Sequence, residues 1–213
     1  LKDDGLFIVE VMYAGDLLST LQWDTLYHEH LAIFSLTSAK ALLERHGYTV
    51  VDVLHLPMHG GSLRVMASPK AGARPHRRVS DMLAAERRAG IDSLAAWQSF
   101  GERVRRQIAI VGRTVEAVAG KYTWWAYGAS GRATMWLNAA GLRGVAKVVD
   151  ESPLRIGRLM PGLHQPIVPP EELRRDQPDY LLVTAWNYYD SIRAKTDWYK
   201  GTWAVPCPAL RFD

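Results

Sequence analysis

The stretch YTWWAYGASGR, residues 122–132, decides the fold class of this chain. Its first six residues are rich in tryptophan and tyrosine and predict a strand, a loop with two glycines follows, and residues 133–140 predict a helix. More strands and a second helix are predicted further along, at residues 146–149, 180–184, 202–205 and 189–199. Strands that alternate with helices form parallel sheets with helices on their faces, so we predict an α/β fold.

The loops that follow the predicted strands are the place to look for a ligand site. Open parallel sheets bind ligands beyond the carboxyl ends of their strands, so the loops that begin at Gly128, Asp150 and Ala185 are predicted to converge on one crevice. The first loop has small residues whose backbone amides can approach a phosphate, and it consists of Gly128, Ala129, Ser130, Gly131 and Arg132. A plain tight turn is the alternative, because the loop lacks the three glycines of dinucleotide-binding patterns.

The first half of the chain shows a different pattern. The β-branched and aromatic residues at 6–11 predict a buried strand. A helix is predicted at 37–47, with Thr37 or Ser38 as its cap and a glycine at its end.

Two β-rich stretches follow that helix. Residues 48–56 and 62–68 flank a turn with two glycines and predict a hairpin or a sharp reversal. Proline and glycine at 69–78 predict a linker. Apolar residues at helical spacing then predict one long helix at 92–120, which would bridge two sub-domains or face a partner subunit.

Composition places the chain among ordinary globular proteins. Its 213 residues are 48% hydrophobic and 23% charged, and no apolar run approaches the roughly 20 residues of a membrane span. The single cysteine, Cys207, allows no internal disulfide, and no secretory leader is visible, so we expect a cytoplasmic protein without a membrane partner. The net charge of +4 would suit anionic partners, but acidic residues interleave with the arginines, which argues against nucleic acid.

A dense group of reactive side chains occupies four consecutive positions, Tyr27, His28, Glu29 and His30, just past a strand. An imidazole can accept a proton at neutral pH, and a neighbouring carboxylate or phenol can orient it. A metal-ligand pair and a satisfied polar cluster are the alternatives. Metal binding is disfavoured, because His28 and His30 would point to opposite faces of an extended chain and no zinc-ligand spacing is present. We therefore predict a catalytic cluster and no metal site.

The turn between the two β-rich stretches is a second candidate binding motif. His59, Gly60 and Gly61 are followed closely by Arg64. Glycines let backbone amides approach a ligand, and a guanidinium offers two parallel donors to anionic oxygens. A structural turn with a surface arginine is the alternative.

Several motifs, taken in order, resemble those of the nucleotide-sugar C-methyltransferases. They are YHEHL at 27–31, FSL at 34–36, HGGSLR at 59–64, YGASG at 127–131, VDESPL at 149–154 and AWN at 185–187. The resemblance extends over nearly the whole chain. Enzymes of this family transfer a methyl group from S-adenosylmethionine to C3 of a 4-keto-deoxysugar that is carried by a nucleoside diphosphate, usually TDP.

The resemblance implies two domains. Residues 1–78 are similar to the last third of a class I S-adenosylmethionine methyltransferase domain with a linker, and residues 79–213 to the family's Rossmann-like carboxyl-terminal domain with its long amino-terminal helix. The family's zinc-binding module and the glycine-rich loop that holds the methyl donor have no counterpart here. We therefore expect a truncated or proteolysed piece, or the product of a split gene, that is inactive alone.

The resemblance also implies roles for single residues. His30 is expected to remove the C3 proton beside the C4 ketone, while Tyr27 and Glu29 orient that base or hydrogen-bond the enolate oxygen. The nucleoside-diphosphate sugar is expected to contact His59, Gly60, Gly61, Arg64, Gly128, Ala129, Ser130, Gly131, Arg132 and Asn187.

Other functions stay open at this point. A non-catalytic sugar-nucleotide binding module, or one half of a split enzyme, would also fit the chain. A nicotinamide-dependent oxidoreductase would use the Gly128 loop and Asp150, but it predicts a third glycine that the sequence lacks. The expected partners are the nucleoside-diphosphate sugar and either a second copy or the missing amino-terminal half, because the strand at 6–13 would otherwise present an exposed edge.

Overall fold

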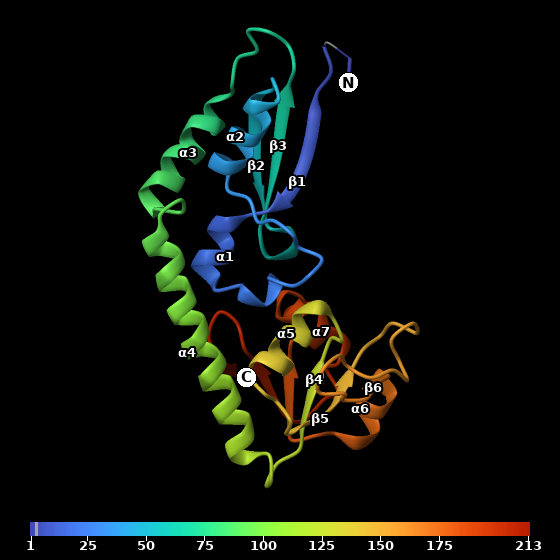
Figure 1. Ribbon diagram of the computed structural model, residues 1–213. Coiled ribbons are helices and arrows are strands. Elements are labelled where there is room, and N and C mark those ends of the chain that lie inside the picture. Colours follow the sequence, from blue (N-terminus) through green and yellow to red (C-terminus); the bar gives the residue numbers. More distant parts are fainter. Residues whose placement is uncertain (3) are drawn as a thin grey trace. The chain divides into compact units, whose positions relative to one another are not determined.

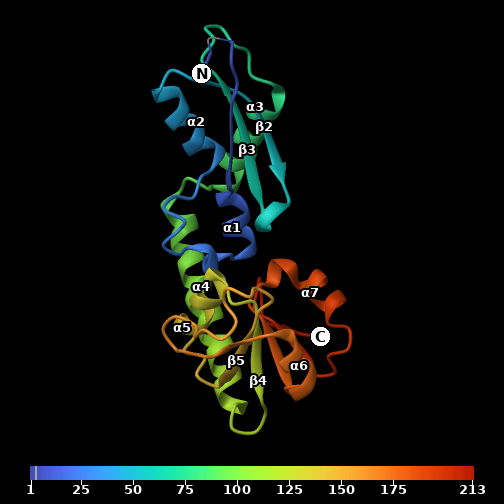
Figure 2. The same ribbon diagram turned by 90° about the vertical axis from the view of Figure 1, so that its right-hand side faces the viewer.

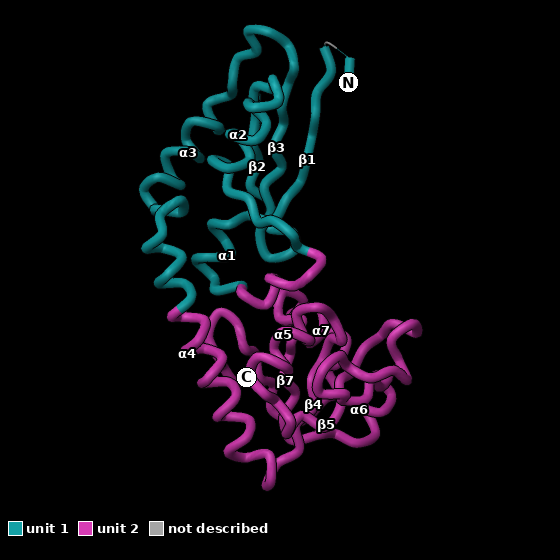
Figure 3. Tube along the Cα trace, in the orientation of Figure 1, with its two compact units in different colours: residues 1–22, 30–101 teal, residues 23–29, 102–213 magenta. Residues whose placement is uncertain are grey.

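The computed structural model describes residues 1–2 and 4–213, and the chain forms two compact units (Figure 3). Unit 1 comprises residues 1–22 and 30–101, and unit 2 comprises residues 23–29 and 102–213. The long helix predicted at 92–120 is confirmed as α4 (Leu94–Val118), and the division between the units falls inside it. The predicted domain boundary after residue 78 follows the family resemblance and stays a prediction.

Unit 1 is built on a three-stranded antiparallel sheet of order β1-β3-β2 (Figure 1). The predicted hairpin is confirmed, since β2 and β3 are consecutive and antiparallel. Val65 on the central strand pairs with Val9 on one side and Val53 on the other. The complete elements of unit 1 are β1 (Phe7–Met12), α1 (Ala14–Thr20), α2 (Leu36–Arg45), β2 (Thr49–Leu56), η2 (Met58–Gly60), β3 (Ser62–Ser68) and α3 (Arg77–Ala89).

The first strand lies where the sequence predicts it, but the prediction that it is buried is wrong. Phe7 is 40% and Ile8 54% exposed. β1 is an edge strand, and β3 is its one neighbour among the described residues. Because only one side of the strand is paired, its apolar side chains stay partly in water.

Helix α2 has its N-cap two or three residues earlier than predicted. Ser35 is the N-cap, and its hydroxyl accepts a hydrogen bond from the amide of Ser38 at 3.0 Å, so neither Thr37 nor Ser38 caps the helix. The remaining amides of the first turn are satisfied by a carboxylate from α3. Glu86, 2% exposed, accepts hydrogen bonds from the amides of Leu36 (2.6 Å) and Thr37 (2.8 Å).

Unit 2 contains a six-stranded sheet of order β6-β5-β4-β7-β8-β9, in which every pair is parallel except β8 with β9. The predicted α/β fold with a parallel sheet is therefore confirmed, and it is Rossmann-like. The sequence analysis did not predict β6, α6 or β9, which are short. The elements are η1 (Trp23–Thr25), β4 (Trp124–Tyr127), α5 (Gly131–Ala139), β5 (Val145–Val149), β6 (Ile167–Val168), α6 (Pro170–Asp176), β7 (Tyr180–Val183), η3 (Trp186–Tyr188), α7 (Tyr189–Lys195), β8 (Thr202–Val205) and β9 (Arg211–Phe212).

Helices cover both faces of this sheet, with α6 and α7 on one side and α5 and α4 on the other (Figure 2). Side chains alternate between the faces along each strand. Trp125 and Leu181 pack with Leu173 of α6 and Ile192 of α7 in one apolar cluster. All four residues of β4 are buried, as expected for a central strand of a parallel sheet. None of the helices in the described part of the chain is long and apolar enough to cross a membrane.

Candidate functional site

The loops at the carboxyl ends of the strands in unit 2 converge, as the sequence predicts. The hydroxyl of Thr184, which follows β7, donates to the carbonyl oxygen of Gly128 at 2.9 Å. A Cβ added to Gly128 would lie 2.6 Å from the Cβ of Ala185, so only glycine allows this approach. Asp150, which follows β5, accepts a hydrogen bond from the amide of Ala129 at 2.7 Å. The Asp150 carboxylate therefore fastens the loop after β4.

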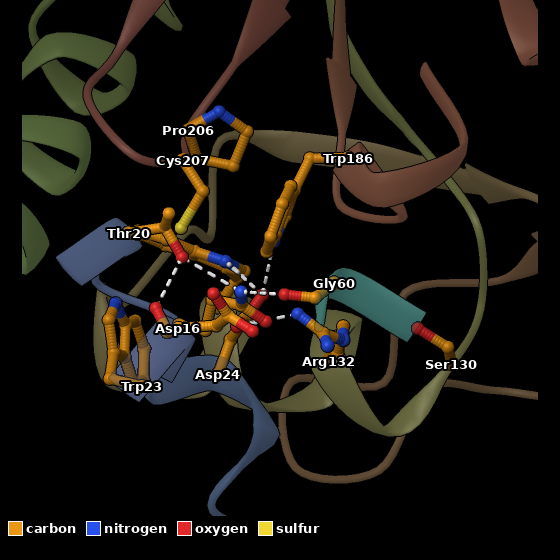
Figure 4. Close-up of polar contacts among 12 residues, drawn as sticks. Asp16, Thr20, Trp23, Asp24, Gly60, Ser130, Arg132, Trp186, Pro206 and Cys207 are labelled. Carbon is orange, nitrogen blue, oxygen red and sulfur yellow. Dashed lines mark hydrogen bonds and ion pairs between the residues drawn. The ribbon is translucent and has the colours of Figure 1, made fainter. Parts of the chain in front are cut away.

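The carboxylate of Asp24 is the centre of a buried polar cluster in unit 2, and much of it is drawn in Figure 4. The side chain is 0% exposed. One oxygen accepts from the indole N–H groups of Trp186 (2.7 Å) and Trp136 (3.1 Å). The other oxygen accepts from the guanidinium of Arg132 at 3.1 Å, and that side chain is only 11% exposed. The donors come from α5 and η3, two elements that follow neighbouring parallel strands.

Burial and pairing act on Asp24 in opposite directions. Removal from water raises the pKa of the Asp24 carboxyl, while Arg132 and the two indoles lower it, and burial has the larger effect. Burial also raises the pKa of the Cys207 thiol, and the charge of Asp24 adds to that shift.

The residue before Asp24 is anchored separately. The indole of Trp23 donates to Gln107 of α4 at 3.1 Å and meets the ring of Trp136 edge-on at 4.7 Å between centroids. The amide of Gln107 donates in turn to the carbonyl oxygens of Pro206 (2.8 Å) and Pro208 (2.9 Å), just after β8. Residues 23–25 are all buried, so the start of this segment is fixed on unit 2.

The predicted catalytic residues, 27–30, come soon after the buried residues 23–25 in the chain. The structure corrects one point: α1 and η1, and not the end of a strand, precede Tyr27. Tyr27 is half-buried, and a Cβ added to Gly131 would lie 2.7 Å from its ring carbons, so the phenol ring lies against the first turn of α5. His28 and Glu29 are exposed, and the rings of Tyr27 and His28 meet edge-on at 6.1 Å. His30, half-exposed, is the first residue after the segment and belongs to unit 1.

Of the other residues predicted in the strand-end loops, some have side chains that already bind within the protein. Arg132 is paired with Asp24, and the Ser130 hydroxyl accepts from the amide of Ala133 as the N-cap of α5. The side-chain amide of Asn187, half-buried in η3, has no hydrogen-bond partner within residues 1–2 and 4–213. Asn187 is therefore the predicted contact whose side chain is available to a ligand.

The glycine turn of unit 1 is packed tightly against its own unit. Gly60 and Gly61 have φ angles of 92° and 121°, which favour glycine. A Cβ on Gly61 would lie 1.9 Å from a carboxylate oxygen of Asp16, and the carbonyl of Gly60 accepts from the amide of Gln22. His59 lies in the same turn, with a φ of 57°.

Two polar side chains near this turn have partners in unit 1. The carboxylate of Asp16 also contacts His55 at 2.6 Å. Arg64 is ion-paired with Glu10, the residue opposite it in the β1–β3 ladder, at 2.9 Å. The Arg64 guanidinium would have to leave or share this carboxylate to bind an anionic ligand.

Sequence reasoning missed a polar pocket of about 270 Å³ at the carboxyl ends of β4 and β5. The Tyr127 hydroxyl donates to Glu151 at 3.0 Å, and Lys195 pairs with the same carboxylate at 3.1 Å. Burial and the Glu151 charge both raise the pKa of Tyr127. Trp198 closes another wall, with the guanidinium of Arg174 at 4.7 Å from its ring centre.

A pocket of about 370 Å³ in unit 1 does not fit S-adenosylmethionine. Apart from His46 and Tyr48, every lining side chain is a hydrocarbon, so partners for ribose hydroxyls and for a charged amino-acid end are lacking there. No group of three or more His, Cys, Asp or Glu residues is placed to hold a metal ion in the part of the chain that the structure describes.

The fold and the strand-end loops define a Rossmann-like α/β protein whose ligand site is expected at the sheet edge. Residues 57–208 match the family described as the C-methyltransferase C-terminal domain, and the chain belongs to that family. The curated C-methyltransferase NovU of Streptomyces niveus is 42% identical over 198 residues, which cover 90% of this chain and 47% of that protein. The chain therefore spans about half the length of the curated relative that it matches.

Proposed function

We propose that this chain is the carboxyl-terminal part of a C-methyltransferase that methylates C3 of a nucleoside-diphosphate 4-keto-deoxysugar. Family membership and the similarity to a C-methyltransferase support the reaction class. The observation that carries the proposal is the place of Tyr27, His28 and Glu29. They belong to residues 23–29, and Asp24 at the start of this segment contacts residues that follow β4 and β7, at the edge where open α/β sheets bind ligands.

The chemistry assigned to this chain is the removal of a proton. His30 acts as the general base that takes the C3 proton beside the C4 ketone, which typically accelerates such a step by about 10² to 10⁴. Tyr27 and Glu29 orient the base or stabilise the enolate oxygen by hydrogen bonding. When bound, S-adenosylmethionine would supply the methyl group to C3 and leave as the neutral thioether S-adenosylhomocysteine.

The substrate is held through its nucleoside diphosphate. In this proposal the backbone of Gly128, Ala129, Ser130 and Gly131 and the side-chain amide of Asn187 contact the ligand in unit 2. Arg132 contributes through the Asp24 pair that fixes the loop, while His59, Gly60, Gly61 and Arg64 supply contacts from unit 1. The non-catalytic binding module stays the alternative, since it needs the same contacts and no base.

Exchange of the C3 hydrogen with solvent tests the base. The full-length enzyme is incubated with the TDP-4-keto-deoxysugar in D₂O without the methyl donor, so that enolate formation is read without methyl transfer. We expect deuterium at C3 with the parent enzyme and at least 10²-fold slower exchange with His30→Asn. Unchanged exchange in His30→Asn would remove His30 from the role.

Calorimetric titration of this chain with TDP tests the nucleotide contacts separately. We expect binding that weakens in Asn187→Ala by about one order of magnitude, as for the loss of one hydrogen bond. Tyr188→Phe, a neighbour whose side chain is exposed, serves as the control. No heat at millimolar TDP would contradict the proposed nucleotide site.

A further inference from the structure

We propose that unit 2 uses its strand-end crevice to hold a segment of its own chain, residues 23–29, and that Asp24 is the positioning residue that fixes Tyr27 for the reaction. The part that concerns catalysis rests on the proposed function, whereas occupancy of the crevice does not.

The position of the segment follows from the sheet order. The chain runs from β4 to β5 in one direction and from β7 to β8 in the other, so the order reverses between β4 and β7. Ligands of open α/β sheets bind at such a reversal, beyond the carboxyl ends of the strands. Asp24 contacts Arg132 after β4 and Trp186 after β7, and Trp23 is linked through Gln107 to the chain after β8. The segment thus contacts residues that follow β4 and β7 directly, and it is linked to the chain after β8 through Gln107.

The chemistry of the cluster is specific for a carboxylate. A buried charge is costly unless it is paired and hydrogen-bonded, and here three donors converge on the two oxygens of one side chain. An asparagine would offer one oxygen and turn an N–H group toward a donor. It would also replace the negative charge that pairs with the Arg132 guanidinium, a side chain that is only 11% exposed, by a neutral amide.

The hydrogen bonds of Asp24 also restrict the position of Tyr27, three residues later in the chain. The amide of Leu26 donates to the carbonyl of Trp23, and the amide of Tyr27 donates to that of Thr25, both at 3.0 Å, so the backbone turns tightly here. The phenol ring then lies against Gly131, where an added Cβ would come within 2.7 Å. Gly131 is the first residue of α5, the helix that also carries Arg132 and Trp136. The same helix therefore holds the Asp24 carboxylate and contacts the phenol ring of Tyr27.

Hydrogen exchange on this chain tests the occupancy of the crevice. In Asp24→Asn we expect the amides of residues 23–29 to exchange at the rate of an open loop, while the amides of β4 and β7 stay protected. The indole N–H resonances of Trp136 and Trp186 should shift in the same variant. Asp190→Asn, the same change at an exposed position of α7, should alter neither. Unchanged protection of residues 23–29 in Asp24→Asn would overturn the proposal.

A second variant covers the case in which Asp24→Asn does not fold. Gly131→Ala keeps Asp24 and its three donor side chains and places a Cβ 2.7 Å from ring carbons of Tyr27. Gly120→Ala is its control, because nothing lies within 4 Å of a Cβ at that position. Slower exchange of the C3 hydrogen in Gly131→Ala than in Gly120→Ala supports positioning, and equal rates oppose it.

Kinetics of the full-length enzyme separate the two proposals. We expect Asp24→Asn and Gly131→Ala to lower kcat for C3 hydrogen exchange by about 10²-fold, a larger factor than any rise in KM for the nucleotide sugar. A loosened segment with unchanged kcat would refute the positioning role. Should His30→Asn keep full exchange, the proposed function fails, while loosening of residues 23–29 in Asp24→Asn would still support occupancy of the crevice.

Discussion

The two units of this chain differ in how completely they bury their sheets. In unit 2, helices cover both faces of the sheet, all four residues of β4 are buried, and a segment of the chain itself contacts the strand ends. In unit 1, β1 lies at the edge of a three-stranded sheet, with Ile8 54% exposed. An apolar pocket of about 370 Å³ lies between side chains of β1 and α2.

The difference shows what each sheet type requires. A parallel sheet must be buried on both faces, so the sequence of unit 2 provides its own cover. An antiparallel sheet tolerates one open face, and its edge strand offers unpaired N–H and C=O groups to another chain. Helices therefore cover both faces of the sheet in unit 2, whereas unit 1 leaves apolar side chains of its edge strand β1 partly exposed within the described residues.

The largest effect is expected in the covered sheet. Leu182→Ala on β7, where the side chain is 0% exposed, should lower the free energy of unfolding by about 2 to 5 kcal/mol, because it opens a cavity in a closed core. Leu154→Ala, at a side chain that is 77% exposed, should change it by less than about 0.5 kcal/mol. Urea unfolding measures both, and equal values would show that Leu182 does not lie in a closed core of unit 2.

A smaller effect is expected at the buried carboxylate of unit 1. Glu86→Gln should cost about 1 to 3 kcal/mol, because one of its acceptor oxygens becomes a donor facing the amides of α2. Glu102→Gln on α4 is the exposed control. The same urea measurement decides, and a loss no greater than that of the control would mean that Glu86 does not hold the start of α2.

The edge of unit 1 should respond in association and not in stability. Ile8→Lys places a charge on the open edge and should reduce self-association in sedimentation experiments, with a stability change within about 0.5 kcal/mol. Ile110→Lys introduces the same charge on α4, at a side chain that is 44% exposed. Identical self-association of the two variants would show that β1 does not mediate self-association.

The smallest effect is a pH dependence in unit 1. The Arg78 guanidinium on α3 lowers the pKa of Asp52 on β2. A lowered pKa means that the ionised carboxylate stabilises the fold above about pH 4 and that this contribution is lost as the pH falls through the lowered pKa. In a series of thermal melts at acidic pH, the melting temperature of Asp52→Asn should depend less on pH than that of Asp81→Asn. An equal pH dependence in the two variants would contradict the ion pair between Asp52 and Arg78.

Periodicity predicted most of the fold, because the long elements bury regular apolar faces. The helix α4 and the alternation of β4, α5 and β5 follow from local pattern alone. The strands β6 and β9 are only two residues long and are defined by their pairing with β5 and β8, so too little local pattern marks them. The exposure of β1 depends on its place in the sheet, which its own apolar sequence does not encode.

The candidate site was predictable only in part for the same reason. The loops at Gly128 and Ala185 were found because the ends of parallel strands must meet at one edge. Asp24 was not found, since its partners Arg132 and Trp186 lie more than 100 residues away in the sequence. From the sequence alone, an isolated Asp next to a tryptophan is expected at the surface. Its burial becomes evident only when the fold places the hydrogen-bond donors around it.

The carboxylate of Glu86 has a consequence for how this protein can be divided or recombined. It sits beyond residue 78, where the linker of the family domains was predicted, yet it completes the start of α2 at Leu36 and Thr37. A chimera joined at that linker would take the helix from one parent and its acceptor from another. Exchange of parts between related enzymes should therefore keep Glu86 and α2 from the same parent. A junction placed within the linker would separate them.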